Sequence, residues 1–256
     1  MVEPLRKAPG DEKQKRPLRG KAKHLGSIKP PVASKGILQD VVHFLLHKPS
    51  IPTLIKFKTH AEQEAFSKRI LQRTGLEVSK YSILNIHKIG IHAPVQHVFN
   101  ELLDWSGDST CWPNHIARVH RVNGELENIQ ILLFGMKLPF GILSPLFYMN
   151  AIRILRTPGS SDYDNARYLL YECSGGYPIG IFSMFVRSSI PEEEEEGQSQ
   201  LFMAVGFDFY GRKSRYKRNI ISRTWEMIHN RASVNIMNRF KQLCEWRFYK
   251  MQNGQS

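Results

Sequence analysis

The stretch from residue 83 to residue 135 places the strongest constraint on the fold of this 256-residue chain. An apolar strand pattern runs directly into Ala93-Pro94, and proline is favoured in the first turn of a helix. Trp112-Pro113 follows in a polar loop, and Asn123-Gly124 then separates two further strand-like runs, which is the strongest short-range signal for a hairpin. The predicted order is therefore strand, helix, loop, strand, turn, strand.

A long amphipathic helix is predicted near the end of the sequence, over residues 216–248. Its apolar residues recur at spacings of three and four and form one stripe: Ile221, Trp225, Ile228, Ala232, Ile236, Phe240 and Leu243. Such a stripe is typical of a helix that packs one face against a core. Its basic residues, among them Lys241, are expected away from the stripe. A sheet that grips one such helix forms a cavity, so this pattern bears on function as well as on fold.

The rest of the chain supplies further strands and an N-terminal extension. Strands are predicted over residues 81–91, 115–122, 126–134, 167–173, 179–188 and 201–210, with a seventh candidate at 151–156. Residues 1–35 are predicted to be a disordered basic tail, since they hold five prolines and few apolar side chains. Residues 36–79 are predicted to be a helical extension with helices at 37–46 and 59–71. Thr59 is the expected N-cap of the second helix, with Glu62 at the capping-box spacing.

Residues 136–148 form an unusual apolar segment in which Lys137 carries the only charge. Pro139, Gly141 and Pro145 predict that it forms neither a regular strand nor a long helix. Two interpretations follow: the segment folds back and covers the sheet or the extension, or it serves as a lid that contacts a membrane. The second interpretation assigns membrane or lid contact to four residues: Leu138, Phe140, Leu143 and Phe147.

The formal net charge of +13 is concentrated at the two ends of the chain. Residues 1–35 hold ten Lys or Arg and three acidic residues, while residues 212–250 hold eleven and two. Basic ends on a near-neutral body predict contact with an anionic surface, either lipid head groups or nucleic acid. The alternative is a solubilising tail and a solvated helix face. Residues 192–196 are consecutive glutamates and are predicted to form a solvated loop tip.

Neither a metal site nor a cofactor is predicted. The three cysteines, Cys111, Cys173 and Cys244, lie far apart in the sequence, which favours a reducing, cytoplasmic compartment. The basic ends of the chain add the possibility of peripheral contact with a membrane. The histidines fall outside any HExxH pattern, and the sequence contains no GxSxG elbow and no glycine-rich phosphate loop. His92 and His97 flank the predicted helix start and are expected to be exposed. The sequence therefore leaves catalysis open and favours binding.

A family resemblance rests on the opening motif of residues 89–103. The run Ile89-Gly90-Ile91-His92-Ala93-Pro94, followed by Val98-Phe99-Asn100-Glu101-Leu102-Leu103 and a tryptophan at Trp112-Pro113, resembles the START-like (SRPBCC) helix-grip superfamily. That group includes polyketide cyclases and lipid-transfer domains. The resemblance covers about residues 80–250 and implies an α+β fold. In that fold a twisted antiparallel sheet of six or seven strands wraps around a long C-terminal helix and leaves a hydrophobic cavity.

The residues expected to line that cavity are apolar or aromatic: Trp112, Phe134, Tyr171, Phe182, Met184, Phe207, Phe209, Trp225 and Ile228. The simpler alternative is that they form an ordinary core. The function favoured by these patterns is binding or transport of a hydrophobic small molecule, such as a lipid, isoprenoid or polyketide. One alternative is a cyclase or aromatase that uses the same cavity. Another is a basic protein that binds an anionic membrane or nucleic acid, and nucleic acid is disfavoured because the aromatic residues are not interleaved with the basic tail.

Overall fold

The computed structural model describes residues 42, 46, 51–71, 83–103, 117–121, 128–137, 143–154, 166–175, 179–207 and 220–254. The predicted tail, residues 1–35, and the Trp112-Pro113 loop lie outside these residues. Of the first predicted helix only Val42 and Leu46 are described, and both are helical.

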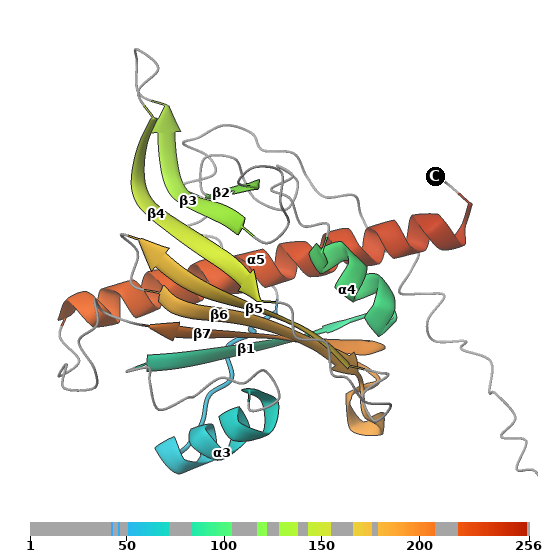
Figure 1. The fold of residues 1–256 in the computed structure, drawn as a ribbon. Coiled ribbons are helices and arrows are strands. Elements are labelled where there is room, and N and C mark those ends of the chain that lie inside the picture. Colours follow the sequence, from blue (N-terminus) through green and yellow to red (C-terminus); the bar gives the residue numbers. More distant parts are fainter. Residues whose placement is uncertain are drawn as a thin grey trace, which may run out of the picture.

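The described strands form a seven-stranded sheet in the order β1-β7-β6-β5-β4-β3-β2 (Figure 1). In chain order they are β1 (Ile83–Ile91), β2 (Ala117–Arg121), β3 (Asn128–Lys137), β4 (Leu143–Ile154), β5 (Ala166–Gly175), β6 (Ile179–Ser188) and β7 (Ser199–Phe207). All neighbours are antiparallel, and β2 pairs with β3 as the Asn123-Gly124 signal predicts. The first strand pairs with the last, so β1 extends the meander from β2 to β7 by one strand and forms an edge of the sheet.

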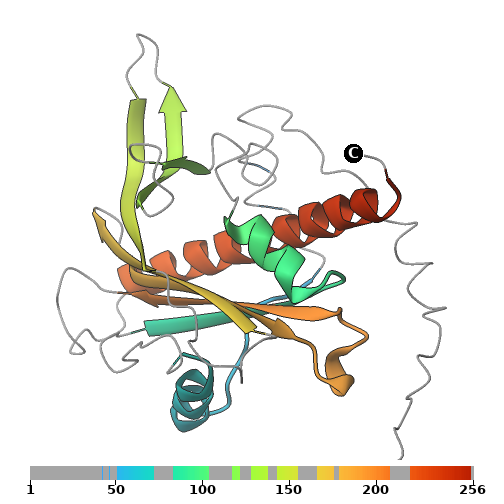
Figure 2. The same ribbon diagram turned by 45° about the vertical axis from the view of Figure 1, so that its right-hand side comes forward.

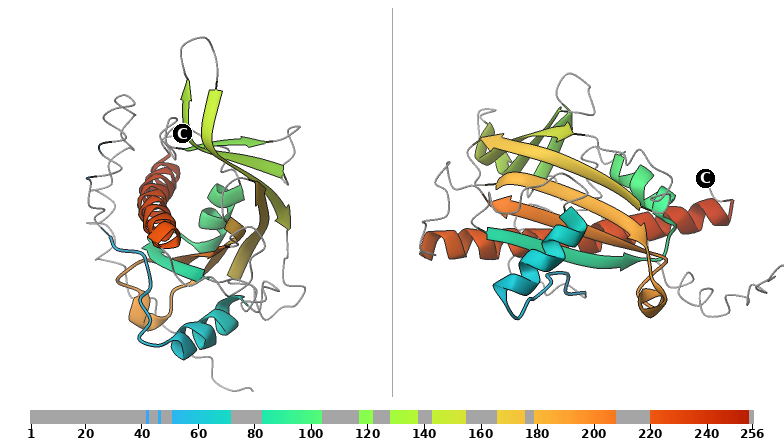
Figure 3. Two further views of the ribbon diagram at one scale, coloured as in Figure 1. Left: turned by 90° about the vertical axis from the view of Figure 1, so that its left-hand side faces the viewer. Right: turned by 60° about the horizontal axis from the view of Figure 1, so that its bottom comes forward.

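Of the helices α3, α4 and α5, two lie on one side of this sheet and one on the other. Helix α4 (Val95–Leu103) follows β1, helix α5 (Ile220–Gln252) follows β7, and helix α3 (His60–Leu71) precedes β1. The left view of Figure 3 looks along α5 and shows the sheet bent around it, with α4 on the same side and α3 on the outside. The predicted α+β class is confirmed, and the arrangement is consistent with a helix-grip fold.

Strand alternation separates two apolar layers. The inner layer joins the concave face of the sheet to α4 and α5 and includes Ile89, Met184 and Phe207 from the strands. The outer layer joins Leu84, Ile86, Ile181 and Ala204 to the extension. The extension therefore covers the convex face of the sheet rather than standing apart from it.

Helix α3 begins where its cap predicts. The backbone N–H of Glu62 donates to Thr59 Oγ1 over 3.1 Å, and the Glu62 carboxylate accepts from the backbone N–H of Lys58 over 3.0 Å. These bonds satisfy donors at the helix N-terminus. Phe66 then anchors the helix, with ring centroids 5.3 Å from Phe57 and 6.3 Å from Phe202.

The expectation that residues 136–148 avoid a regular strand is wrong for the second half of that segment. Strand β4 runs through Leu143, Pro145 and Phe147, and Pro145 pairs with Gly135 of β3. Strand β5 pairs with β4 only from Met149 onward, so Pro145 has a strand neighbour on one edge alone. A residue without an N–H is tolerated at such an edge.

The β3–β4 hairpin consequently extends beyond the rest of the sheet, as Figures 1 and 2 show. Of the predicted lid residues, Leu143 and Phe147 belong to β4. Leu138 and Phe140 lie outside the described residues.

Residues 51–57, here called the strap, run along the outer edge of β1. Leu54 forms an antiparallel bridge with His87. The N–H of Ile55 donates to Ile86 O over 2.9 Å, and the N–H of Lys88 donates to Thr53 O over 2.8 Å. Side chains cover two more groups of this edge, since Gln63 donates to Leu84 O and Lys241 to Gly90 O. The edge of β1 is thereby protected from pairing with another chain.

Candidate ligand-binding site between the sheet and helix α5

Three of the predicted cavity residues meet on the concave face of the sheet. Phe182, Met184 and Phe207 are buried in the cluster that contacts α4 and α5. Phe182 and Met184 lie opposite Val205 and Met203 in the β6–β7 register, which places all of them in adjacent strands. The structure therefore brings these three side chains into the layer beneath α5.

The other predicted residues are placed less fully. Phe134 lies in β3, Tyr171 in β5 opposite Phe182, and Trp225 in α5, where the backbone alone is described. Ile228 is in α5 and partly exposed. Trp112 and Phe209 lie outside the described residues, so their assignment stays a prediction.

The apolar stripe of α5 is more deeply buried toward the C-terminus of the helix than toward its N-terminus. Phe240 and Leu243 are 3% and 2% exposed. At 100° per residue, Ile236 points between the directions of Phe240 and Leu243, and it touches the same core cluster, yet it is only partly buried. Ala232 and Ile228 point about 40° and 80° further round the helix than Ile236, at the border of the inward face, and are also partly exposed. Apolar surface is therefore left uncovered along this border in the N-terminal half of the helix.

The most deeply buried face of α5 is displaced from the predicted stripe. The buried positions include His229, Ser233, Met237, Cys244 and Phe248. Lys241, which was expected away from the core, is also buried, so that part of the prediction is wrong. The apolar stripe therefore forms one border of the inward face. Polar residues that have partners on β1 form the other border.

A network of uncharged polar side chains joins β1, α5 and the strap. Asn85 Nδ2 donates to Asn230 Oδ1 over 2.8 Å, and His87 Nε2 lies 3.3 Å from the same oxygen. Because an amide oxygen only accepts, His87 Nε2 carries the proton, and the hydroxyl of Thr53 then donates to His87 Nδ1 over 2.9 Å. This tautomer follows from the hydrogen-bond network.

Both histidines of this region are held neutral. Burial lowers the pKa of His87 to about 4, and the hydrogen bond with Asn230 opposes the shift only in part. Burial lowers the pKa of His229 to about 3, and the nearby His87 adds to the effect. His229 lies 3.3 Å from Ser233 Oγ through Nδ1, and its ring stands edge-on to Phe207 at 5.2 Å. Period-two alternation within β1 was the signal that could have placed Asn85 and His87 on the inward face.

Among the side chains that the structure describes, no group of three or more His, Cys, Asp or Glu could hold a metal ion. His87 and His229 act here as hydrogen-bonding groups.

The C-terminal half of α5 is fastened by charged groups instead. Lys241 Nζ lies 2.6 Å from Glu245 Oε1, and the same oxygen accepts the backbone N–H of His92 over 2.7 Å. Arg247 pairs with Glu101 of α4 over 2.6 Å. These contacts tie the helix both to the end of β1 and to α4.

His97 of α4 and Cys244 of α5 meet where this half of the helix is fastened. The prediction that His97 is exposed is wrong, since its side chain is 14% exposed and Nε2 lies 3.1 Å from Cys244 O. Burial raises the pKa of the Cys244 thiol, with the carboxylates of Glu101 and Glu245 adding to the rise. A thiol held neutral in this way is a packing group rather than a nucleophile.

The glutamate run at residues 192–196 is not simply a solvated tip. Glu193 pairs with Arg187 over 2.8 Å and with Lys88 over 2.9 Å, and Lys88 also reaches Glu196. Partial burial of Glu193 would raise the pKa of its carboxyl group, but the hydrogen bonds from Arg187 and Lys88 outweigh it and lower that pKa to about 2. The run therefore fastens the β6–β7 connection to β1.

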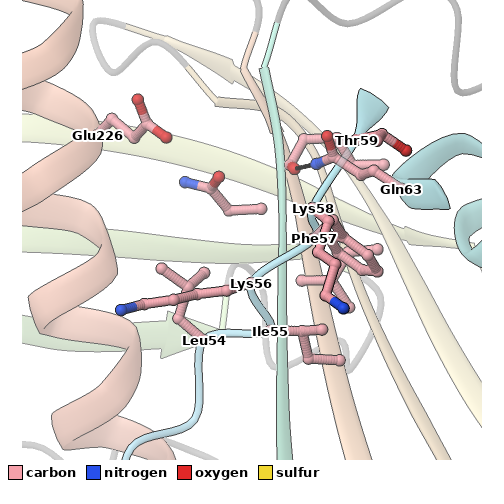
Figure 4. Close-up of a pocket in the computed structure, with 11 residues that line it drawn as sticks. Leu54, Ile55, Lys56, Phe57, Lys58, Thr59, Gln63 and Glu226 are labelled. Carbon is pink, nitrogen blue, oxygen red and sulfur yellow. Dashed lines mark hydrogen bonds between the residues drawn. The ribbon is translucent and has the colours of Figure 1, made fainter. Parts of the chain in front are cut away.

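A surface pocket of about 440 Å³ opens where the strap leaves β1, close to the start of α5. Figure 4 shows Leu54, Lys56 and Glu226 on one side of β1 and Ile55, Phe57 and Gln63 on the other. Asn85 also lines the pocket, so one end of the polar network borders it.

Comparisons with known proteins found remote similarities. No family model and no curated protein matches this chain. Among solved structures, a conserved protein from Geobacillus kaustophilus is 12% identical, with a TM-score of 0.35, over 63% of this chain and 95% of that one. The di-domain ARO/CYC StfQ from the steffimycin biosynthetic pathway is 11% identical, with a TM-score of 0.37, over 77% of this chain and 57% of that one. This chain thus spans little more than half the length of the second protein.

A search of the described helices found none that combines the length and the apolar character needed to cross a bilayer.

Proposed function

We propose that this protein binds and carries an apolar small molecule of the lipid, isoprenoid or polyketide class. The ligand lies between the concave face of the sheet and the N-terminal half of α5. The observation that carries this proposal is the incomplete cover over Ile236 and Ala232, next to the buried Phe240 and Leu243.

Apolar surface that is left uncovered at the border of the inward face favours an apolar occupant. Around Phe240 the helix and the sheet bury each other's apolar side chains. Around Ile236 and Ala232 the helix still presents aliphatic groups that are only partly buried. Burial of a ligand chain against them contributes about 0.8 kcal/mol per CH₂, so binding there needs no charged partner.

Binding is favoured over cyclase-type catalysis. The described polar groups beside this region include His229 and Ser233, which are both buried. A histidine whose pKa is about 3 is a weak base at neutral pH. These residues therefore suit hydrogen bonding to a ligand better than proton transfer.

Two variants on one helix test the proposal. Ala232→Trp adds a bulky side chain at a partly exposed position of the stripe, whereas Met227→Trp places the same side chain at a position that is 64% exposed. The uncharged probe N-phenyl-1-naphthylamine reports binding by its fluorescence. We expect Ala232→Trp to weaken probe binding at least tenfold and Met227→Trp to leave it unchanged, with similar melting temperatures. A folded Ala232→Trp that binds the probe like the parent would refute the proposal, while native mass spectrometry of the parent should detect a co-purified apolar molecule.

A further inference from the structure

The two halves of α5 are held to the sheet by different kinds of contact. In the C-terminal half, Lys241 and Glu245 form a buried ion pair that also binds backbone groups of β1 and His92. In the N-terminal half, the described links to β1 are hydrogen bonds between uncharged side chains such as Asn85 and Asn230. Separation of a buried ion pair leaves unpaired charges, whereas neutral hydrogen bonds exchange with water at little net cost. The seam between β1 and α5 therefore opens more easily in its N-terminal half.

The strap spans the border between the two halves. Ile51 N donates to Asn238 Oδ1 over 3.2 Å, and Asn238 Nδ2 donates to Ile51 O over 2.8 Å, so the start of the strap is bound to α5 just past the middle of the helix. Two residues later Thr53 is 2% exposed and bonds to His87, which in turn reaches Asn230 of α5. Ile51 thus joins the strap to α5, while Thr53 joins it to β1 and, through His87, to α5.

The two ends of the strap are anchored unequally. Ile55 and Phe57 pack on the outer apolar layer with Phe66 of α3. The residues before them, by contrast, are held by the polar contacts of Ile51 and Thr53. The pocket at the point where the strap leaves β1 brings the surface up to Asn85. Water can therefore reach the network from that end, and the start of the strap can lift while α3 stays in place.

We propose that the strap is a latch. Its first residues, 51–54, lift from β1 and α5, the seam opens beside the N-terminal half of the helix, and the apolar ligand enters and leaves there. This inference rests on the proposed function, and it places the route of exchange at the β1–α5 seam rather than at the β3–β4 hairpin.

A disulfide across the strap tests the latch. Leu54 and His87 form a directly opposed antiparallel pair whose flanking residues make the hydrogen bonds, a geometry with a Cα separation of about 4.5 Å. That separation lies in the range of disulfides. Leu54→Cys and His87→Cys are combined in a background in which Cys111 and Cys173 are replaced by Ser. The reduced form of the same protein is the matched control for the loss of His87.

We expect oxidation to slow both association and dissociation of N-phenyl-1-naphthylamine at least tenfold, with a Kd within twofold of the reduced form. Reduction should restore both rates. Equal rates in the two forms, with intact binding, would overturn the latch alone. Absence of probe binding in both forms and in the parent would overturn the proposed function, and the route with it.

Amide exchange in the unmodified protein gives an independent readout. The N–H of Lys88 bonds to Thr53 O in the part of the strap that lifts, whereas Val205 lies in the interior strand β7. We expect the Lys88 amide to exchange at least ten times faster than that of Val205. Asn238→Ala should accelerate it further, together with probe dissociation. Exchange of Lys88 as slow as that of Val205 would show that the strap does not lift, and would overturn the latch.

Discussion

Lys241 and Glu245 form a buried ion pair on successive turns of α5, with 2.6 Å between Nζ and Oε1. The ammonium group also donates to Gly90 O, and the same carboxylate oxygen accepts the N–H of His92. The pair therefore fixes the helix at the point where β1 ends and the chain turns toward α4. In the proposed latch, this contact holds the C-terminal half of α5 to β1 while residues 51–54 lift.

Removal of one partner of this pair should be strongly destabilising. Lys241→Met leaves the Glu245 carboxylate buried without its cation, and we expect a loss of about 3–5 kcal/mol in the free energy of unfolding measured with urea. The double variant Lys241→Met/Glu245→Leu should recover most of that loss. Gln242→Met, at an exposed position of the same helix, is the control and should change stability by less than about 0.5 kcal/mol. A loss below about 1 kcal/mol for Lys241→Met would contradict the role assigned to the pair.

Gly90 should tolerate no side chain. A Cβ atom at this position would overlap the backbone carbonyl of Glu196, which cannot rotate away. We expect Gly90→Ala to destabilise the protein by about 1–3 kcal/mol, the usual range for overpacking. Thermal unfolding measures the effect, and an unchanged melting temperature would show that the β6–β7 connection shifts freely. Gly254→Ala meets no atom within 4 Å and serves as the comparison, although its φ of +64° adds a small local cost.

Stability should fall as the pH drops below about 6.5, because His87 and His229 are buried in the neutral state. Their folded-state pKa values of about 4 and 3 lie below the ordinary value of 6.5, so the unfolded chain binds more protons between these limits. The contribution of the two neutral histidines to the free energy of unfolding is therefore fully present above pH 6.5. It is lost progressively toward pH 3, at about 1.4 kcal/mol per pH unit for each histidine. Urea unfolding at pH 7, 6 and 5 checks this.

The interval from pH 7 to pH 5 separates the histidines from Glu193. Its carboxyl pKa is lowered from 4.5 to about 2, so its contribution is present above pH 4.5 and is lost below it. His87→Gln should reduce the slope between pH 7 and pH 5 by about 1.4 kcal/mol per unit relative to the parent. An equal slope in the two proteins would mean that His87 titrates in the folded state near its ordinary pKa.

The basic N-terminal residues are predicted to attract anionic lipid. Deletion of residues 1–35 removes a net charge of +7 and should weaken binding to vesicles that contain phosphatidylserine. Because surface charge is screened by salt, the difference between the two proteins should shrink as NaCl is raised from 50 to 300 mM, on the scale of the Debye length. Co-sedimentation measures both effects. Equal binding at low salt would exclude the tail as the membrane contact.

We expect the apolar β3–β4 hairpin to contact a membrane, separately from the route of ligand exchange. Phe140→Asp and Phe147→Asp should each reduce vesicle binding at least fivefold if these side chains enter the bilayer. Phe147 is in β4, so loss of folding in that variant would instead assign it to the sheet. Folded variants that bind vesicles like the parent would exclude insertion of the hairpin.

The sequence by itself determined the elements whose signals are local. The Thr59–Glu62 cap started α3, Ala93-Pro94 started α4, and the apolar spacing of residues 220–252 produced α5, because each depends on groups only a few residues apart. Period-two alternation likewise identified most of the strands. From these, the α+β class and the strand–helix order followed.

Only the tertiary structure decided which polar groups are buried. Pro145 fits a strand because β5 does not reach it, and Lys241 enters the core because Gly90 and Glu245 satisfy its ammonium. The strap pairs with β1 although Pro52 and its short length indicate no strand. His87 meets Thr53 and Asn230 across 34 and 143 residues of sequence. No periodicity can predict such partners, since the energy of a buried polar group depends on atoms that the chain brings together only when it is folded.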